Sequence, residues 1–241
     1  AGAPRASARI GRPKPRAGKI FFVDVPGAPQ SVISLGHAGP VRKARDYFAT
    51  SLMSLILGGS FSSRINMNLR EEHGYAYGAR GGFSYTRSEG SFRADASVRA
   101  DVTKESVQEI YKEISGLLAT GVTPEELARE QEGKILSLAG QFATGAQVLG
   151  SFRGLMYFGL PLDYYDQYVK NVKSVVKPQV DASAKKYLKP AALQVVVVGD
   201  GATVLPKLKE IIDSGELGKG KLVVLDVDGD EIDAGAATAA A

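Results

Sequence analysis

The chain has 241 residues, of which 44% are hydrophobic, and it contains no cysteine. This length and apolar content allow a sizeable buried core, which excludes a disordered protein. Without cysteine the chain can form no disulfide, thiolate nucleophile or cysteine-ligated metal site, and its redox compartment stays open. The longest apolar runs, 52–57 and 193–198, are far shorter than the roughly 20 residues that span a bilayer.

The positive charge is concentrated at the N-terminus. Thirty basic and 26 acidic residues give a formal charge of +4. Six of the bases precede the first acidic residue, Asp24: Arg5, Arg9, Arg12, Lys14, Arg16 and Lys19. Residues 21–241 then carry 24 bases against 26 acids, a balance of −2. The remainder of the chain therefore lacks the basic character that attracts nucleic acid.

The two ends of the chain differ in composition from the part between them. Residues 1–19 combine three prolines with Gly, Ala and Arg, which predicts a solvated linker, although a frayed terminus has the same composition. If this segment anchored RNA or an anionic surface, deleting 1–18 would abolish a salt-sensitive binding signal, and we expect no such loss. The alanine-rich residues 229–241 predict a disordered tail. One folded domain is left, at 20–228.

This domain begins with two predicted strands, 20–25 and 31–38, joined by a turn that contains Pro26, Gly27 and Pro29. A helix follows over 45–57 and ends at the pair of glycines at 58 and 59.

A second helix is predicted over 62–73, with Phe61, Ile65 and Leu69 on one face. Gly74 stands where a left-handed residue would end this helix.

The next two segments predict a β-hairpin, formed by 75–85 and 91–100. Alternation places four aromatic side chains of the first strand on one face: Tyr75, Tyr77, Phe83 and Tyr85. In the second strand the apolar residues Phe92, Ala94, Ala96 and Val98 alternate with Arg93, Asp95, Ser97 and Arg99. The hairpin therefore has one face in contact with solvent.

The rest of the domain is mainly helical. Thr123 is a capping residue followed by proline and two acids, which predicts a helix start. Further helices are predicted over 103–118, 145–158, 163–172, 179–188 and 205–214, and strands over 193–198 and 221–227. Because strands and helices come in blocks, the fold class is α+β, with an antiparallel sheet covered by helices.

No complete catalytic centre is present in the sequence. It has neither HxxEH nor HExxH, and its two histidines, His37 and His73, are 36 positions apart. We expect His37 at a strand end and His73 at a helix terminus, where its charge would favour the dipole. The Gly-Asp-Gly run at 199–201 lacks the spacing of a phosphate loop and predicts a turn, and no GxSxG elbow occurs.

Residues 57–78, LGGSFSSRINMNLREEHGYAYG, carry a resemblance to a known family. They resemble the zinc-free half of the pitrilysin, or insulinase-like, zinc metallopeptidases, the inverted-motif family that includes mitochondrial processing peptidase. A looser resemblance extends from Lys19 to about Val227. In that family an HxxEH half binds zinc, and a second half of similar fold supplies an arginine and, seven residues later, a tyrosine. Arg70 and Tyr77 match that pattern, whereas the HxxEH half is not in this chain.

The resemblance implies a function for the pair. Arg70 and Tyr77 would be hydrogen-bond donors at pH 7, suited to peptide carbonyl groups and to the oxyanion of an endopeptidase reaction. Zinc would be bound by the partner half, which would activate water and come from the same precursor or a separate subunit. The substrate would be a peptide or unfolded polypeptide. The resemblance also implies the bacterial periplasm or cell envelope, with the cytoplasm left open.

Other interpretations fit the same residues. An arginine seven residues before a tyrosine is common, and a strand tyrosine among aromatic residues usually belongs to the core. Tyr75, two residues before Tyr77, would lie on the same face and competes for its role. The glycines around the pair could admit a peptide backbone or simply form turns and bulges. The chain could also be a non-catalytic interaction partner that keeps the fold without the chemistry.

Overall fold

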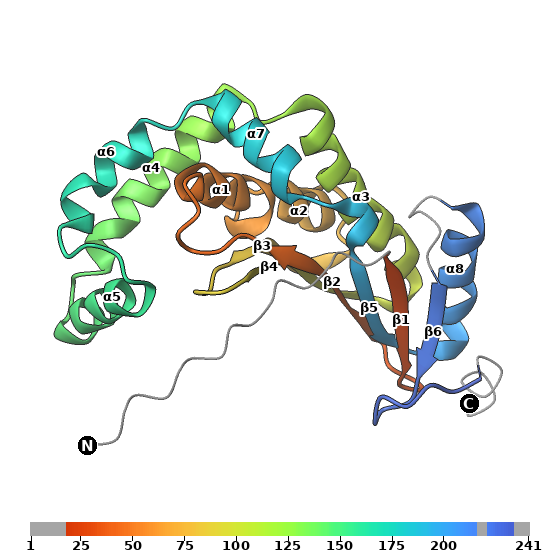
Figure 1. Cartoon of the computed structure of the whole chain (residues 1–241). Coiled ribbons are helices and arrows are strands. Elements are labelled where there is room, and N and C mark those ends of the chain that lie inside the picture. Colours follow the sequence, from red (N-terminus) through yellow and green to blue (C-terminus); the bar gives the residue numbers. More distant parts are fainter. Residues whose placement is uncertain (1–17, 216–220, 234–241) are drawn as a thin grey trace, which may run out of the picture.

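The computed structural model describes residues 18–215 and 221–233, so most of the predicted linker and the end of the predicted tail, 234–241, lie outside the described residues. The described strands form one sheet (Figure 1). They are β1 (Lys19–Asp24), β2 (Gln30–Gly39), β3 (Ala76–Ser84), β4 (Gly90–Arg99), β5 (Gln194–Gly199) and β6 (Lys221–Leu225).

The strand order in the sheet is β3-β4-β2-β5-β1-β6. Three neighbouring pairs are antiparallel, β3 with β4, β4 with β2, and β2 with β5. This confirms the predicted α+β class with an antiparallel sheet. Strand β1 is parallel to both of its neighbours, β5 and β6, and β5 and β6 are joined by a helical crossover.

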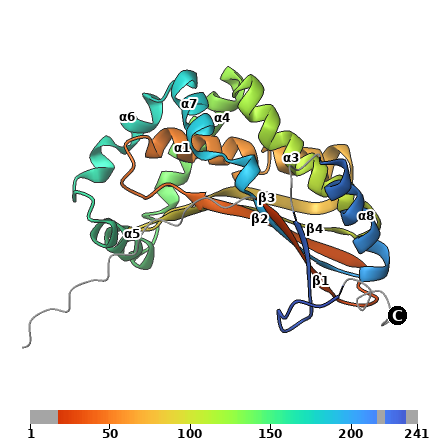
Figure 2. The ribbon, with the colours of Figure 1, turned by 45° about the vertical axis from the view of Figure 1, so that its right-hand side comes forward.

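The helical elements cover one face of this sheet, and α5 lies beyond the end of the β3–β4 hairpin (Figures 1 and 2). The α-helices are α1 (Tyr47–Ser54), α2 (Arg64–Asn66), α3 (Thr103–Thr120), α4 (Pro124–Gly140), α5 (Gly145–Phe158), α6 (Tyr168–Lys173), α7 (Lys177–Tyr187) and α8 (Gly201–Ser214). Two π-helical segments, η1 (Leu55–Gly59) and η2 (Met67–Glu72), continue α1 and α2. Single 3-10 turns are η3 (Ala100–Val102), η4 (Tyr164–Gln167) and η5 (Pro190–Ala192).

The core lies between the sheet and these helices. Phe22, Ile33 and Leu35 on the inner face of the sheet are fully buried, and so are Leu52 and Ile56 on the helices above them. The predicted alternation of β4 is confirmed, with its apolar residues buried, Arg93 and Arg99 exposed and Asp95 half-buried. Val32 and Val196 lie exposed on the opposite face of the sheet, so that face is partly apolar.

Two predicted helices differ in detail from the structure. Helix α8 begins at Gly201, four residues before the predicted start, because the Asp200 carboxylate caps it by accepting from the Thr203 N–H at 3.0 Å. The segment predicted as one helix at 62–73 is one turn of α-helix followed by π-helix. Its predicted apolar face is only partly right: Ile65 is buried, whereas Phe61 is 63% exposed.

Candidate functional site

The site is built where the segment 57–78 packs against β3. Gly58 lies so close to the strand that a Cβ at this position would be 2.4 Å from the backbone nitrogen of Gly81. Only glycine permits such an approach of two backbones. The contact fixes η1 against β3, just before the chain enters the loop that carries Ser60 and Phe61.

Side chains from the helices occupy the free edge of β3. The Ala79 N–H donates to Oδ1 of Asn66 at 3.0 Å, and the Phe83 N–H donates to Oγ of Ser54 at 2.8 Å. Asn66 also donates through Nδ2 to the carbonyl oxygen of Phe61 at 2.7 Å. Asn66 therefore ties the loop at Phe61 to the strand, and these two N–H groups are not available to pair with another strand.

A β-bulge decides where Tyr77 points. Ala76 pairs with Val98 and Ala79 pairs with Ala96, so three steps along β3 oppose two along β4. The extra residue shifts the alternation. Ala79 and Phe83 face the core, whereas Tyr77 is 89% exposed. The prediction that Tyr77 shares a face with Phe83 is therefore wrong, because strict alternation does not continue through a bulge.

The bulge brings Tyr77 next to Arg70. The guanidinium carbon of Arg70 lies 5.0 Å from the centre of the Tyr77 ring and 4.8 Å from the centre of the Phe61 ring, both within cation–π range. Nε of Arg70 is also 3.0 Å from a carboxylate oxygen of Glu71. Gly74, with φ of +61°, takes the predicted left-handed conformation and turns the chain from η2 back into β3.

Arg70 and Tyr77 line a common cleft of about 390 Å³. Its other lining residues are Gly59, Ser60, Phe61, Asn66, Gly78, Ala79 and Arg80, so no carboxylate is among them. Tyr75 is outside this lining: its ring is partly buried and stacks on His73 with 4.8 Å between centres. Of the two competing tyrosines, Tyr77 is the one that faces the cleft.

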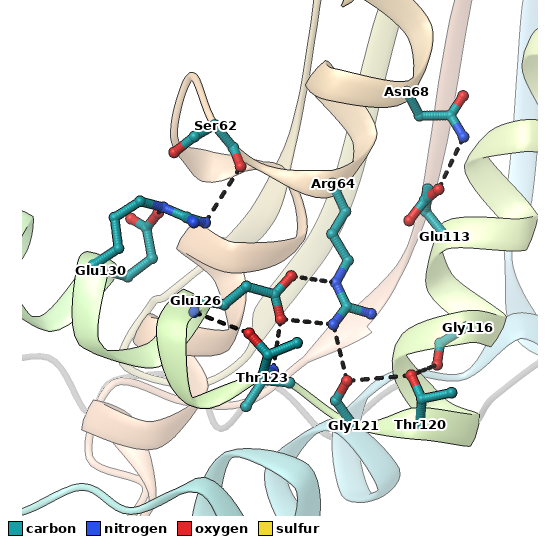
Figure 3. Close-up of polar contacts among 12 residues, drawn as sticks. Ser62, Arg64, Asn68, Glu113, Gly116, Thr120, Gly121, Thr123, Glu126 and Glu130 are labelled. Atoms are coloured by element: carbon teal, nitrogen blue, oxygen red, sulfur yellow. Dashed lines mark hydrogen bonds and ion pairs between the residues drawn. The ribbon is translucent and has the colours of Figure 1, made fainter. Parts of the chain in front are cut away.

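A second arginine of the same segment holds the site to the helices. Arg64 donates to both oxygens of Glu126, at 2.6 and 2.7 Å, and to the carbonyl oxygen of Gly121 at 2.9 Å (Figure 3). Glu126 also accepts from the Thr123 N–H at 2.7 Å, while its own N–H donates to Oγ1 of Thr123, which forms a capping box at the start of α4. Burial raises the pKa of Glu126, but the hydrogen bonds from Arg64 and from the Thr123 backbone outweigh burial and lower it.

Two more polar residues anchor the segment. Oγ of Ser60 donates to the buried carboxylate of Glu130 at 2.9 Å, and Glu130 also accepts from Nε of Arg129. Nδ2 of Asn68 donates to Glu109 and Glu113 on α3. The cleft thus rests on acidic side chains of α3 and α4. The sequence predicted Thr123 as a cap but gave no sign that its capping partner also binds Arg64, because that contact joins residues 62 positions apart.

Neither histidine has a geometry suited to a metal ion. The His37 ring stacks on Phe92 with 5.1 Å between centres, contacts the Ala38 carbonyl through Nδ1, and accepts from the Lys189 N–H through Nε2. His73 lies at the end of η2, as predicted, 3.8 Å from Glu109. Within the described ranges no group of three or more His, Cys, Asp or Glu side chains could hold a metal ion. Over the same ranges, we find no helix with the length and apolarity needed to cross a membrane.

The sequence also matches a family of known proteins. The model of the peptidase M16 inactive domain family matches residues 3–134, more than half of the chain. The chain belongs to this family. The resemblance to the zinc-free half of the pitrilysin-type peptidases, which rested on residues 57–78, is thereby confirmed. A search of curated proteins found no match.

Solved structures of an M16 inactive domain and of proteases share the fold. The peptidase M16 inactive domain from Pseudomonas fluorescens is 28% identical, with a TM-score of 0.74 over 81% of this chain and 46% of that one. A protease from Helicobacter pylori is 19% identical, with a TM-score of 0.74 over 82% of this chain and 48% of that one. A putative zinc protease from Bordetella pertussis is 16% identical, with a TM-score of 0.60 over 70% of this chain and 93% of that one. The chain therefore spans about half the length of the first two proteins.

Proposed function

We propose that this M16 inactive domain is the substrate-binding half of a zinc metalloendopeptidase, and that Arg70 and Tyr77 donate hydrogen bonds to a peptide. The observation that carries the proposal is the convergence of these two side chains on one open cleft. Neither residue is a nucleophile or a base at pH 7, so their contribution is to bind and to stabilise charge.

The surroundings of the pair suit this role. The Tyr77 hydroxyl is exposed and forms no hydrogen bond to another side chain or backbone group of the described residues, so it is free to donate. Arg70 is held between its contacts to Phe61 and Glu71, which leaves part of its fork of five N–H groups for a ligand. Donors placed around a scissile carbonyl stabilise the oxyanion as it forms, and the loss of one donor typically costs about 3 to 4 kcal/mol.

The proposal assigns zinc to another part of the protein. The described histidines and carboxylates do not form a zinc site, so the metal would belong to an HxxEH half. That half would come from the same polypeptide or from a separate subunit in a heterodimer. The relatives that are about twice as long as this chain support the existence of such a half. Location in the periplasm or cell envelope remains a prediction.

Cleavage of a mixed peptide pool by the complete assembly tests the proposal. The comparison includes wild type, Tyr77→Phe, Tyr75→Phe and the isolated 241-residue chain. Tyr77→Phe removes only the exposed hydroxyl, so turnover should fall about 100-fold or more while the two halves still assemble. Tyr75→Phe is the matched control, because Tyr75 lies outside the cleft, and it should cut like wild type. The isolated chain should be inactive.

An interaction partner without catalytic function is the alternative. On that interpretation Tyr77→Phe cuts as fast as wild type, since the hydroxyl would contact no substrate. Several apolar side chains of α5 are exposed, among them Leu149 and Met156, which is a feature of surfaces that bind other proteins. The same set of variants therefore separates a catalytic half from a structural one.

A further inference from the structure

A larger cavity lies away from the Arg70–Tyr77 cleft, where α4 and α5 meet the loop after β2. It has a volume of about 640 Å³. Its lining residues are Arg42, Tyr47, Ser137, Gly140, Gln141, Gln147, Gly150, Ser151, Gly154, Leu155, Phe158, Leu160, Tyr164 and Tyr165, and none of them lines the first cleft. The Arg42 N–H donates to the carbonyl oxygen of Thr86, in the turn of the β3–β4 hairpin. The cavity thus lies near one end of β3 and Tyr77 near the other, seven residues or roughly 23 Å apart along the strand.

Arg42 is the charged residue of this cavity, and aromatic rings position it. Its guanidinium carbon is 3.4 Å from the centre of the Tyr47 ring, a close cation–π contact. One of its nitrogens donates to the Tyr164 hydroxyl at 2.7 Å. Arginine has five N–H donors in a planar fork, and the described side chains engage only this one. The rest of the fork is held in place without an acceptor among the described residues.

The positive charge of the cavity is not neutralised. None of the lining residues is acidic, and neither Arg42 nor the neighbouring Lys134 forms an ion pair within 18–215 and 221–233. Asp46, the nearest acid along the chain, is engaged by Lys186 and Tyr187. Burial lowers the pKa of Lys134, and the charge of Arg42 lowers it further. An anion bound here would relieve this repulsion.

The wall formed by α5 leaves room for a ligand. Gly150 and Gly154, four residues apart, face the cavity, and a Cβ added at either position would meet no atom within 4 Å. Gln141 and Gln147 supply neutral amide donors, while Phe158 and the tyrosines supply apolar surface. A polar and charged end beside aromatic walls suits a carboxylate attached to an apolar group.

We infer that this cavity binds a carboxylate of a peptide, next to an aromatic or aliphatic side chain, with Arg42 as the principal donor. The inference rests on the proposed function only in the choice of a peptide as the ligand. An extended peptide of about eight residues bound along the hairpin would reach from this cavity to the Arg70–Tyr77 cleft. The carboxylate is either the C-terminus of that peptide or an acidic side chain, because both present the same two oxygens to arginine.

Direct binding to the 241-residue chain tests the inference. Isothermal titration calorimetry measures the affinity for four unlabelled octapeptides that combine an internal Glu or Gln with a free or an amidated C-terminus. Removing both carboxylates should weaken binding by about tenfold or more. Loss on amidation alone assigns the C-terminus as the ligand, and loss on the change of Glu to Gln alone assigns the acidic side chain.

Variants locate the binding. Gly154→Leu places a side chain in the empty cavity and should weaken binding by about tenfold or more. Gly133→Leu, on the exposed surface of α4 with no atom near its added Cβ, is the matched control and should bind like wild type. Arg42→Gln should remove the preference for the charged peptides. Equal affinity of Gly154→Leu and Gly133→Leu, or equal affinity for neutral and acidic peptides, would overturn the inference.

The result is separable from the proposed function. Tyr77→Phe should keep the wild-type ratio of affinities for the acidic and the neutral peptides, because Tyr77 does not line the cavity. If Tyr77→Phe cleaves as fast as wild type while the cavity still binds carboxylates, only the proposed function fails. If Tyr77→Phe cleaves slowly but the cavity shows no preference for carboxylates, only this inference fails.

Discussion

The guanidinium carbon of Arg70 lies 5.0 Å from the centre of the Tyr77 ring, although Arg70 belongs to a π-helix and Tyr77 to a β-strand. Two local features create this contact. The left-handed Gly74 reverses the chain, and the bulge in β3 turns Tyr77 away from the core. Both features are needed, because without the bulge the alternation of β3 would place Tyr77 on the buried face.

Arg70→Lys should lower turnover by about tenfold or more in the complete assembly. Lysine keeps the charge but loses the planar fork that contacts two rings and can also donate to a carbonyl. The free energy of unfolding should change by no more than about 0.5 kcal/mol, since Arg70 lies at the surface. Arg99→Lys is the control for a general effect of losing a guanidinium, because the Arg99 side chain is exposed at the end of β4 and lies outside the cleft. Full activity of Arg70→Lys would mean that only its charge is used.

Gly58→Ala should destabilise the chain by about 1 to 3 kcal/mol, because its new Cβ would overlap the backbone of Gly81. Gly116→Ala on α3 is the matched control. Its Cβ would meet no atom within 4 Å, and replacing a helical glycine by alanine should stabilise the chain by roughly 0.5 to 1 kcal/mol. Urea unfolding measures the change in the free energy of unfolding for both variants, and the two changes should have opposite signs. Two shifts in the same direction would contradict the close contact between η1 and β3.

Glu126→Gln should destabilise the chain by about 1 to 3 kcal/mol, since a neutral amide cannot replace both charged hydrogen bonds with Arg64. Glu125→Gln, the exposed neighbouring acid, should change stability by no more than about 0.5 kcal/mol. The folded-state pKa of Glu126 lies below its ordinary value of 4.5. Its contribution is therefore present above pH 4.5 and lost as the pH falls through the folded pKa. Equal unfolding midpoints for the two variants at pH 7 would argue against this clamp.

His37 should make the chain less stable in mild acid. Burial lowers its pKa below the ordinary value of 6.5, while the Ala38 carbonyl acts against this shift and Lys189 adds to it. Between the folded pKa and 6.5 the unfolded chain binds more protons. Stability is therefore at its full value above pH 6.5 and falls as the pH drops below it.

Urea unfolding of two histidine variants between pH 7.5 and 5.5 measures this effect. His37→Gln should remove most of the loss of stability below pH 6.5. His73→Gln should keep it, because His73 is exposed at the end of η2. A slope that survives in His37→Gln would assign the acid sensitivity to other groups.

The order of helices and strands could be predicted from local sequence, and the structure confirms it. Periodicity located the hairpin, and the cap at Thr123 located the start of α4. Element ends were less certain where a side chain sets them, as Asp200 does for α8. The candidates Arg70 and Tyr77 came from the resemblance of residues 57–78 to a known family, and their role stays a prediction. The bulge that brings them to one cleft depends on how β3 pairs with β4.

The sequence by itself indicated the family, showed that this chain has no HxxEH and singled out Arg70 and Tyr77 as candidates, because these depend on residue identity and short spacing. Only the tertiary structure decided which tyrosine faces the cleft, how Arg64 is clamped by Glu126, and that Arg42 stands in a cavity without an acid. These relationships join residues that are distant in sequence, and packing of the whole chain sets them. Local patterns carry no information about such contacts until the sheet and its covering helices are assembled.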